Sequence, residues 1–170
     1  SIYNLHVPLD NFGEHSTTVT LAKALGIKPD KSFAPYYGAL CGVFGLTDVK
    51  TVQALKNKFK EAVGHEVSLY NYGDEKIENQ MVAVVAGGGN DIEILEDVHK
   101  AGVNTFVTGI TAKNEHSQVA HDFAEKNKIN ILGGTHYSTE RFACLSMVDY
   151  FKEAGLSSEF IDDQPVMEDM

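Results

Sequence analysis

Apolar residues follow two patterns along this chain, and each pattern predicts one kind of element. Short stretches rich in apolar and β-branched residues predict strands, and the continuous apolar run at residues 81–86 is typical of a strand buried on both faces. The predicted strands are residues 2–6, 38–46, 66–72, 81–86, 105–107 and 129–132, with 160–161 as a further edge strand. Apolar positions spaced by three and four residues predict helices at residues 16–25, 48–63, 91–101, 114–126 and 138–154.

This alternation of strands and helices predicts an α/β fold, a layered sheet with helices on its faces. Residues 27–37 contain two prolines and are expected to form a loop, which is the one plausible boundary in the chain. We therefore expect a single domain over residues 1–170, in which residues 1–30 are the remnant of an upstream layer. The acidic tail from Asp162 onward is expected to be loose.

The charge balance narrows the range of partners. The chain carries 14 basic and 24 acidic side chains, a net charge of −10, which disfavours binding to the phosphate backbone of nucleic acids. No apolar run approaches the roughly 20 residues that a membrane crossing needs. The two cysteines, Cys41 and Cys144, provide no disulfide framework, and their apolar neighbours in the sequence predict buried, reduced thiols in a cytoplasmic protein.

His136 and Glu140 form the first candidate site. They follow the predicted strand at residues 129–132 and lie at a strand-to-helix turn, where open α/β sheets bind ligands. Being four residues apart, they point the same way on a helical turn, a spacing that can hold one metal ion or let the carboxylate bridge two ions. The alternative is structural, with Glu140 opposing the helix dipole and His136 hydrogen-bonded to backbone in a loop.

A second histidine and carboxylate pair, His6 and Asp10, lies around the end of the first predicted strand, which Pro8 is expected to terminate. Taken alone, this pair is better explained by an Asx turn at Asp10 and a core-facing His6. Two such pairs, both at predicted strand ends, favour a common site. Asp, His and Glu together form a mixed nitrogen and oxygen ligand set, which suits Zn, Mn, Fe or Ni better than Ca.

Both segments also resemble motifs of a known family. The residues His-Val-Pro-Leu-Asp at 6–10 resemble the H-T-x-x-D motif of the Nif-three-like dinuclear metal-centre hexameric proteins. The residues Gly-Thr-His-Tyr-Ser-Thr-Glu at 134–140 resemble the late G-H-x-x-T-E motif of that family. Between them, residues 86–89 resemble its glycine-rich turn and residues 107–109 its T-G-[DE] strand end, in the same order.

The resemblance implies the Nif-three-like architecture, a homohexameric toroid, and a site for up to two divalent ions per chain, with Zn, Mn, Fe, Ni or Mg as candidates. It implies that Asp10, His136 and Glu140 are metal ligands, with Glu140 able to bridge, and that His6 lies beside the metals as a catalytic residue. The family's upstream His-His-Pro motif, which would supply two more ligands, has no counterpart here. We therefore expect this chain to correspond to the later two-thirds of a member.

Two functions of different classes follow from this resemblance. The first is a metal-dependent hydrolase of GTP-cyclohydrolase type, acting on a nucleotide or another small phosphorylated or cyclic-amide substrate, in which His6 orients or deprotonates the attacking water. The second is a non-enzymatic, metal-stabilised scaffold or adaptor, and a folded but metal-free member is a third possibility. A catalytic site keeps an open coordination position for water, whereas protein ligands fill a structural site.

The three glycines at residues 87–89 follow the predicted buried strand. They favour a tight turn that needs positive φ angles. The alternative is a cradle in which backbone N–H groups bind a phosphate or carboxylate at the start of the next helix. Residues 108–111 and 114–116 are further candidates for lining the same pocket.

Overall fold

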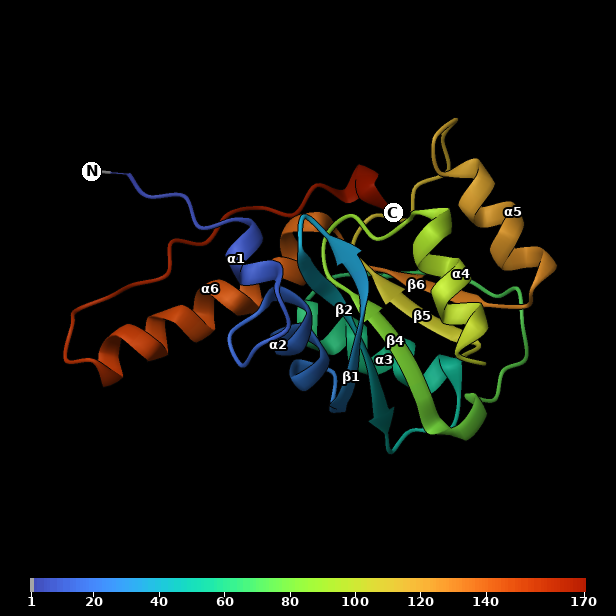
Figure 1. Ribbon diagram of the computed structural model, residues 1–170, viewed down its shortest axis with the longest axis horizontal. Helices are drawn as coiled ribbons and strands as arrows, with labels where there is room; N and C mark the ends of the chain where they lie inside the picture. Colours follow the sequence, from blue (N-terminus) through green and yellow to red (C-terminus); the bar gives the residue numbers. More distant parts are fainter. Residues whose placement is uncertain (1) are drawn as a thin grey trace.

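Six strands form one mixed sheet at the centre of the molecule (Figure 1). The structure is a computed structural model that describes residues 2–170. The strands are β1 Ile27–Tyr36, β2 Ala39–Thr47, β3 Ser68–Tyr70, β4 Met81–Val85, β5 Thr105–Thr108 and β6 Asn130–Gly133. Their order in the sheet is β1-β2-β4-β5-β6-β3. The central strands β4, β5 and β6 run parallel, and the outer pairs β1–β2, β2–β4 and β3–β6 run antiparallel.

Helices cover both faces of the sheet, so the fold has three layers (Figure 1). They are α1 Val7–Asp10, α2 Thr17–Ala24, α3 Val52–Val63, α4 Ile92–Lys100, α5 Gln118–Lys126 and α6 His136–Glu153, with 3-10 turns at Glu78–Gln80 and Met167–Asp169. Leu21 of α2 and Phe59 of α3 belong to one apolar core, and Leu95 of α4 belongs to the other. Because alternate residues of a strand face opposite sides, Val84 joins the first core and Val85 the second. The α/β architecture predicted from the sequence is confirmed.

Residues 27–37, predicted to be a loop, form the strand β1 over most of their length. β1 pairs antiparallel with β2, and the register shifts between Pro29 and Lys31. The prediction is wrong because β1 is the edge strand of the sheet, where a proline that lacks an N–H group interrupts no inner ladder. The segment expected to mark a boundary is therefore part of the main sheet.

Three other predicted elements also differ from the structure. The segments 2–6 and 160–161, both among the described residues, are not strands. Pro8 does not end a strand but lies in the first turn of α1, where a proline is tolerated because that N–H has no helical partner. The helix predicted at residues 114–126 begins only at Gln118.

The start of α6 lies two residues earlier than the Ser138 that the sequence predicts. Thr135 is the N-cap residue, and its Oγ1 accepts a hydrogen bond of 3.0 Å from the backbone N–H of Ser138. In return, Oγ of Ser138 accepts a hydrogen bond of 3.0 Å from the backbone N–H of Thr135. This reciprocal capping makes His136 the first residue of the helix.

The tail from Asp162, expected to be loose, folds back over the start of α6. The hydroxyl of Tyr137 donates a hydrogen bond to the Asp162 carboxylate. The carbonyl of Asp169 accepts hydrogen bonds from the backbone N–H groups of Thr111 and Ala112, at 2.7 Å and 2.8 Å. Contacts between distant segments order this tail, and its local sequence does not reveal them.

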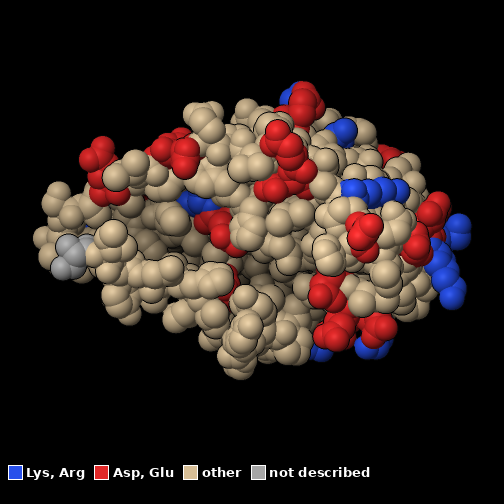
Figure 2. Space-filling view, turned by 90° about the horizontal axis from the view of Figure 1, so that it is seen from above, with Lys and Arg blue, Asp and Glu red and all other residues tan. Residues whose placement is uncertain are grey.

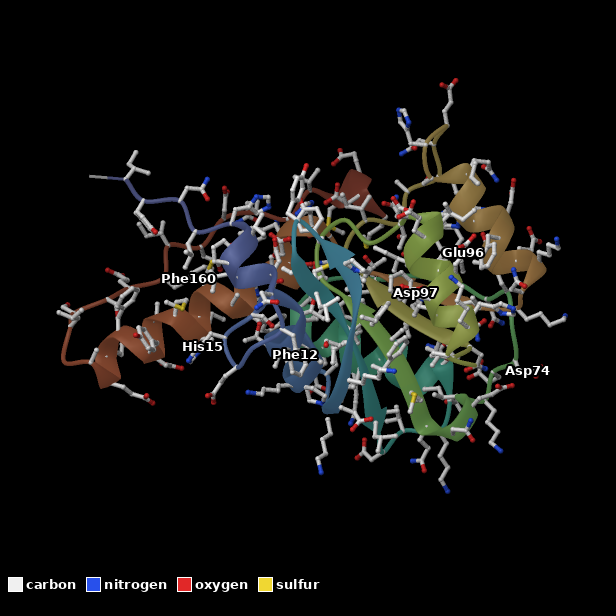
Figure 3. The ribbon with its side chains drawn as sticks, in the orientation of Figure 1. Phe12, His15, Asp74, Glu96, Asp97 and Phe160 are labelled. Atoms are coloured by element: carbon white, nitrogen blue, oxygen red, sulfur yellow. The ribbon has the colours of Figure 1, made fainter. Side chains whose placement is uncertain are left out.

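On the face seen from above, most of the surface is uncharged, and Asp and Glu side chains cover more of it than Lys and Arg do (Figure 2), in keeping with the net charge of −10. His15 and Phe160 lie toward the end of the molecule that carries α6, Phe12 lies nearer its middle, and Glu96 and Asp97 lie on α4 toward the other end (Figure 3). None of the helices within residues 2–170 combines the length and the apolar character that crossing a membrane requires.

Candidate functional site

The carboxyl ends of the parallel strands β4, β5 and β6 meet at one edge of the sheet, and hydrogen bonds join the loops that follow them. The carbonyl of Gly87 accepts hydrogen bonds of 3.0 Å from the N–H groups of Gly109 and Ile110. The N–H of Gly134 donates to the carbonyl of Thr108 at 3.1 Å. Helix α6 starts directly beyond β6, so its first turns lie at the edge where open α/β sheets bind ligands.

His136 and Glu140 lie side by side on α6, as their spacing of four residues predicts. Nε2 of His136 is 3.0 Å from Oε1 of Glu140, and the two side chains are 49% and 33% exposed. This hydrogen bond raises the pKa of the His136 imidazole above its usual value, although partial burial opposes the increase. The two side chains are therefore held next to each other, are accessible to solvent, and favour a positive charge on the His136 imidazole.

Asp10 is a buried carboxylate, only 9% exposed, at the end of α1. The hydroxyl of Thr17, in the first turn of α2, donates a hydrogen bond of 3.2 Å to its Oδ1. Burial raises the pKa of Asp10, the Thr17 hydrogen bond lowers it, and the negative charge of Glu140 raises it again. A cation placed near both carboxylates would relieve this repulsion.

His6 completes the set of four predicted residues. Its Nε2 is 3.9 Å from Oδ2 of Asp10, and its side chain is 65% exposed. Helix α1 brings these two residues together, and the strand end predicted from the sequence is absent. The spacing of four residues has the same consequence in both elements, since it puts a histidine and a carboxylate on one face of a helical turn.

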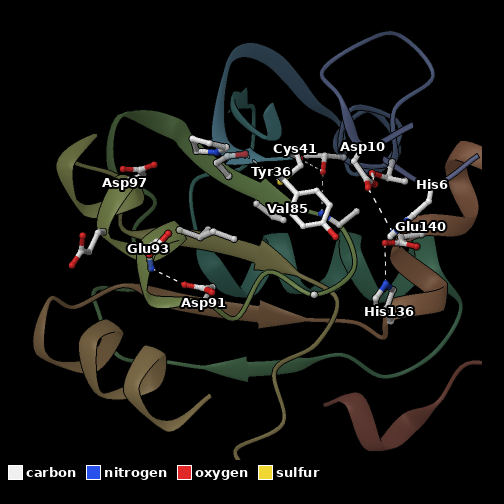
Figure 4. A pocket seen from close by; sticks show the side chains of 18 of the residues that line it. His6, Asp10, Tyr36, Cys41, Val85, Asp91, Glu93, Asp97, His136 and Glu140 are labelled. Carbon is white, nitrogen blue, oxygen red and sulfur yellow. Dashed lines mark hydrogen bonds and ion pairs between the residues drawn. The ribbon is translucent and has the colours of Figure 1, made fainter. Parts of the chain in front are cut away.

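The two pairs line one cavity of about 680 Å³, which Figure 4 shows from close by. His6, Asp10, His136 and Glu140 form one end of it. The cavity extends from there toward β1 and α4, where its walls include Tyr36, Ile94, Asp91, Glu93, Glu96 and Asp97. The structure thus assembles residues separated by 130 positions in the sequence into a single concave site.

The chemistry of this donor set fits a divalent ion, because two imidazoles and two carboxylates face one cavity. The side-chain arrangement does not yet enclose an ion. Within residues 2–170, no three His, Cys, Asp or Glu side chains come close enough together to hold a metal. His136 and Glu140 hydrogen-bond to each other, so a metal ion bound by both side chains would take the place of the proton between them.

The glycine turn after β4 supports the same end of the cavity. The φ angle of Gly87 is +70°, so the predicted tight turn with positive φ is confirmed. The N–H of Gly87 donates to Oγ1 of Thr139 at 2.9 Å, and the N–H of Gly89 donates to Oγ1 of Thr108 at 3.0 Å. These two N–H groups bind threonine hydroxyls, which argues against the alternative of an anion cradle at this turn.

Comparison with known proteins identifies the family. Residues 1–165 match the family model described as Duf34/NIF3 (NGG1p interacting factor 3). The chain belongs to the Duf34/NIF3 family. A GTP cyclohydrolase 1 type 2 homolog from Archaeoglobus fulgidus is 28% identical to it over 163 residues, which cover 95% of this chain and 61% of that protein. The homolog of the same description from Pyrococcus horikoshii is 29% identical over 165 residues, which cover 95% and 62%.

Solved structures show the same fold in this Duf34/NIF3 chain and in longer proteins. Protein ybgI, described as of unknown function, superposes with a TM-score of 0.81 at 24% identity, over 96% of this chain and 62% of its own. Reduced HcgD from Methanocaldococcus jannaschii superposes with a TM-score of 0.70 at 18% identity, over 91% and 58%. The chain therefore spans about 60% of the length of the proteins that it resembles.

In this Duf34/NIF3 chain, Cys41 is a cavity residue that sequence reasoning placed in the core. Burial raises the pKa of its thiol, and the nearby charge of Asp10 raises it further, so the neutral thiol is favoured. Cys144 is exposed, and its predicted burial is wrong. No sequence pattern identifies Cys41 or Thr17 as neighbours of Asp10, because their proximity depends on how α1 packs against β2 and α2.

Residues 108–111 and 114–116 were further candidates for the pocket lining. All of them are described in the structure, and none of them lines this cavity. The backbone of Thr111 instead contacts the tail, through the hydrogen bond that its N–H donates to Asp169. The cavity is built from α1, α2, β1, β2, α4 and α6, with the end of β4 and the turn that follows it.

Proposed function

We propose that this Duf34/NIF3 chain binds one or two divalent metal ions through Asp10, His136 and Glu140. We further propose that it belongs to a metal-dependent hydrolase that acts on a nucleotide or another small phosphorylated or cyclic-amide substrate. The observation that carries the proposal is the shared cavity, in which two histidine and carboxylate pairs from distant parts of the sequence meet. The relatives' name, GTP cyclohydrolase 1 type 2 homolog, agrees with this class of reaction.

The residues have separate roles in this proposal. A bound divalent ion would lower the pKa of water and polarise the bond to be cleaved. Asp10, buried and bonded to Thr17, provides a carboxylate with a fixed orientation. His6 is exposed and lies next to Asp10, so its Nε2 is placed to take a proton from an attacking water. The cavity volume of about 680 Å³ is that of a site for a small molecule.

Metal content per chain tests the first half of the proposal. Protein purified without chelator and reloaded with Mn²⁺ or Zn²⁺ is expected to bind one or two ions per chain. Glu140→Ala is expected to abolish tight binding with an unchanged circular dichroism spectrum, since Glu140 lies near the start of α6 and outside both apolar cores. Glu93→Ala is the matched control, because Glu93 lines the same cavity at its α4 end.

Either of two results would contradict the assignment of Glu140 as a ligand: an unfolded Glu140→Ala protein, or a metal content equal to that of wild type. If metal binds as expected, turnover of GTP and of simple phosphate esters by the metal-loaded protein tests the hydrolase. The two free cysteines favour a reducing, cytoplasmic location for this activity.

A second candidate function is a metal-stabilised oligomeric scaffold, such as the homohexamer implied by the sequence resemblance. The observation that favours it is an apolar surface at the outer end of α6 and the segment that follows. It includes Tyr150, Leu156 and Ile161, at 48%, 57% and 86% exposure. Light scattering with and without metal separates the candidates, because a scaffold requires metal-dependent assembly in the absence of turnover.

A further inference from the structure

Asp10 belongs to an element that is too short to fix its own side chains. Helix α1 has four residues, Val7–Asp10, and the next residue, Asn11, already has an extended backbone. A single helical turn is unstable in isolation, because the first turn of a helix is costly to form. The carboxylate of Asp10 therefore needs contacts from outside α1 to keep one orientation.

Thr17 supplies such a contact from the start of α2. It is the first residue of that helix, is 8% exposed, and donates the hydrogen bond of 3.2 Å to Oδ1 of Asp10. The next residue, Thr18, fastens the same turn to the sheet. Its hydroxyl donates to the carbonyl of Cys41 in β2 at 2.6 Å. It also accepts a hydrogen bond of 3.1 Å from the backbone N–H of Ala86, which follows β4. Two successive threonines thus connect the central strands to the carboxylate of Asp10.

The Thr17 hydroxyl occupies one of the two carboxylate oxygens of Asp10. The other oxygen, Oδ2, is the one that lies 3.9 Å from Nε2 of His6, and both residues line the cavity. Figure 4 shows Asp10 and His6 together at the end of the cavity that also holds Glu140. Because Oδ1 is engaged by Thr17, Oδ2 is the oxygen that this arrangement leaves for a cation in the cavity.

We propose that Thr17 is a positioning residue for metal binding, which holds Oδ1 of Asp10 so that Oδ2 is presented to a divalent ion. This role rests on the proposed metal site, and it gives that site a component that is not itself a ligand. Carboxylates that bind metals are commonly oriented by a hydrogen bond of this kind, and loss of the bond weakens metal affinity. The sheet, through Thr18 and Thr17, then determines the orientation of a ligand on a helix of one turn.

The test compares Thr17→Val with Thr17→Ser by calorimetric titration of the metal-free proteins with Mn²⁺ or Zn²⁺. Valine replaces the hydroxyl with a methyl group. Thr17→Val is therefore expected to weaken metal binding by about tenfold or more, the usual effect of removing a hydrogen bond to a metal ligand. Serine keeps the donor, so Thr17→Ser is expected to keep an affinity close to that of wild type.

Thr20→Val is the matched control. Thr20 lies on the same helix and is also 8% exposed, but its hydroxyl donates to the carbonyls of Ser16 and Thr17, and it is not among the residues that line the cavity. This variant is expected to bind metal as wild type does. Wild-type affinity in Thr17→Val would overturn the proposal. Equal losses of affinity in Thr17→Val and either Thr17→Ser or Thr20→Val would do the same, because they would show a general disturbance of α2.

A double-mutant cycle in metal-free protein tests the contact without any ion. In wild type, Thr17→Val removes the donor to a buried carboxylate and is expected to shift the unfolding equilibrium about tenfold toward the unfolded state. In an Asp10→Ala background the hydroxyl has lost its acceptor, so the same substitution is expected to be neutral or stabilising. Equal effects in the two backgrounds would overturn the proposal.

The two measurements separate this proposal from the proposed function. If wild type binds metal and Thr17→Val binds it equally well, the metal site stands and the role of Thr17 fails. If wild type binds no metal, the proposed function fails, and the cycle alone decides whether Thr17 holds the carboxylate of Asp10.

Discussion

Gly87 and Glu140 are in direct contact: a Cβ atom built on Gly87 would overlap Oε1 of the Glu140 carboxylate and lie 2.9 Å from Nε2 of His136. The turn after β4 and the first turns of α6 therefore meet at a point where only a hydrogen atom fits. This contact fixes how closely the histidine and carboxylate pair approaches the end of the central strand. A residue with no chemical function of its own thus shapes the candidate site.

Gly87→Ala is expected to displace Glu140 and His136 and so to weaken divalent metal binding by about tenfold or more, the usual effect of altering a group that orients metal ligands. The substitution also strains the backbone, because φ at this position is +70°. Calorimetric titration of the metal-free variant with Mn²⁺ or Zn²⁺ measures the affinity, and urea denaturation measures the free energy of unfolding.

Gly102→Ala is the matched control for this substitution. The φ angle of Gly102 is +69°, and a Cβ atom there would have nothing within 4 Å. It should therefore show the backbone strain alone, roughly 1–2 kcal/mol of lost stability, with wild-type metal affinity. Equal losses of metal affinity in both variants would mean that the contact with Glu140 is not the cause.

Local geometry made part of this site predictable from the sequence. The pairing of His136 with Glu140 depends only on the helical period, so the spacing of four residues was sufficient. His6 and Asp10 met for the same reason, although the element that carries them is the helix α1 and not the predicted strand end. The contribution of Gly87 could not be predicted, because its contact with Glu140 joins a turn and a helix that are distant in the sequence.

Asp10→Asn is expected to abolish metal binding and yet to stabilise the metal-free protein at neutral pH. Burial and the charge of Glu140 raise the pKa of Asp10 above its usual 3.8, so the folded state binds this proton more tightly than the unfolded state does. The stability that this tighter proton binding adds is fully present below pH 3.8 and is lost as the pH rises through the folded-state pKa of Asp10. Asparagine carries no charge that burial would disfavour, and its side-chain oxygen can still accept the hydrogen bond from the Thr17 hydroxyl. Urea denaturation at pH 7 measures the gain.

Asp74→Asn provides the comparison for this gain, since Asp74 is an exposed surface residue far from the cavity lining. It is expected to leave both stability and metal binding unchanged. If Asp10→Asn lowered the free energy of unfolding of the metal-free protein, the buried charge would have to be compensated by interactions other than its bond to Thr17.

The errors in the predicted fold have a common physical origin in long-range contacts. The prolines of β1 argued for a loop, but an edge strand has no inner partner for the missing N–H. The tail after Asp162 is acidic and lacks periodicity, and the contacts that order it are with Tyr137 and the backbone of Thr111 and Ala112. The pattern of residues within a segment predicts its secondary structure well where those residues alone determine that structure, as in the buried strand β4 and the amphipathic helix α3.

Because His121 is buried, we expect the protein to lose stability at mildly acidic pH. It is 1% exposed, its Nε2 donates a hydrogen bond of 2.9 Å to the carbonyl of Thr111, and the hydroxyl of Tyr72 lies 3.1 Å from its Nδ1. Burial lowers the pKa of this imidazole below its usual 6.5, and the Thr111 carbonyl opposes that shift only in part. Above about pH 6.5 the His121 imidazole is neutral in both the folded and the unfolded state, whereas below that pH the unfolded chain binds a proton first. The free energy of unfolding is therefore expected to fall from pH 6.5 toward the folded-state pKa.

His121→Gln should reduce this loss, and the comparison with wild type isolates the effect of His121. That comparison is needed because the raised pKa of His136 has the opposite sign: it adds stability below pH 6.5 that is lost as the pH rises through its own folded-state value. Urea denaturation at several values between pH 8 and pH 5 gives the slope for each protein. His99→Gln, at an exposed position on α4, is the matched control for replacing a histidine with glutamine. A His121→Gln protein with an unchanged slope would show that protonation of this buried histidine does not limit stability in acid.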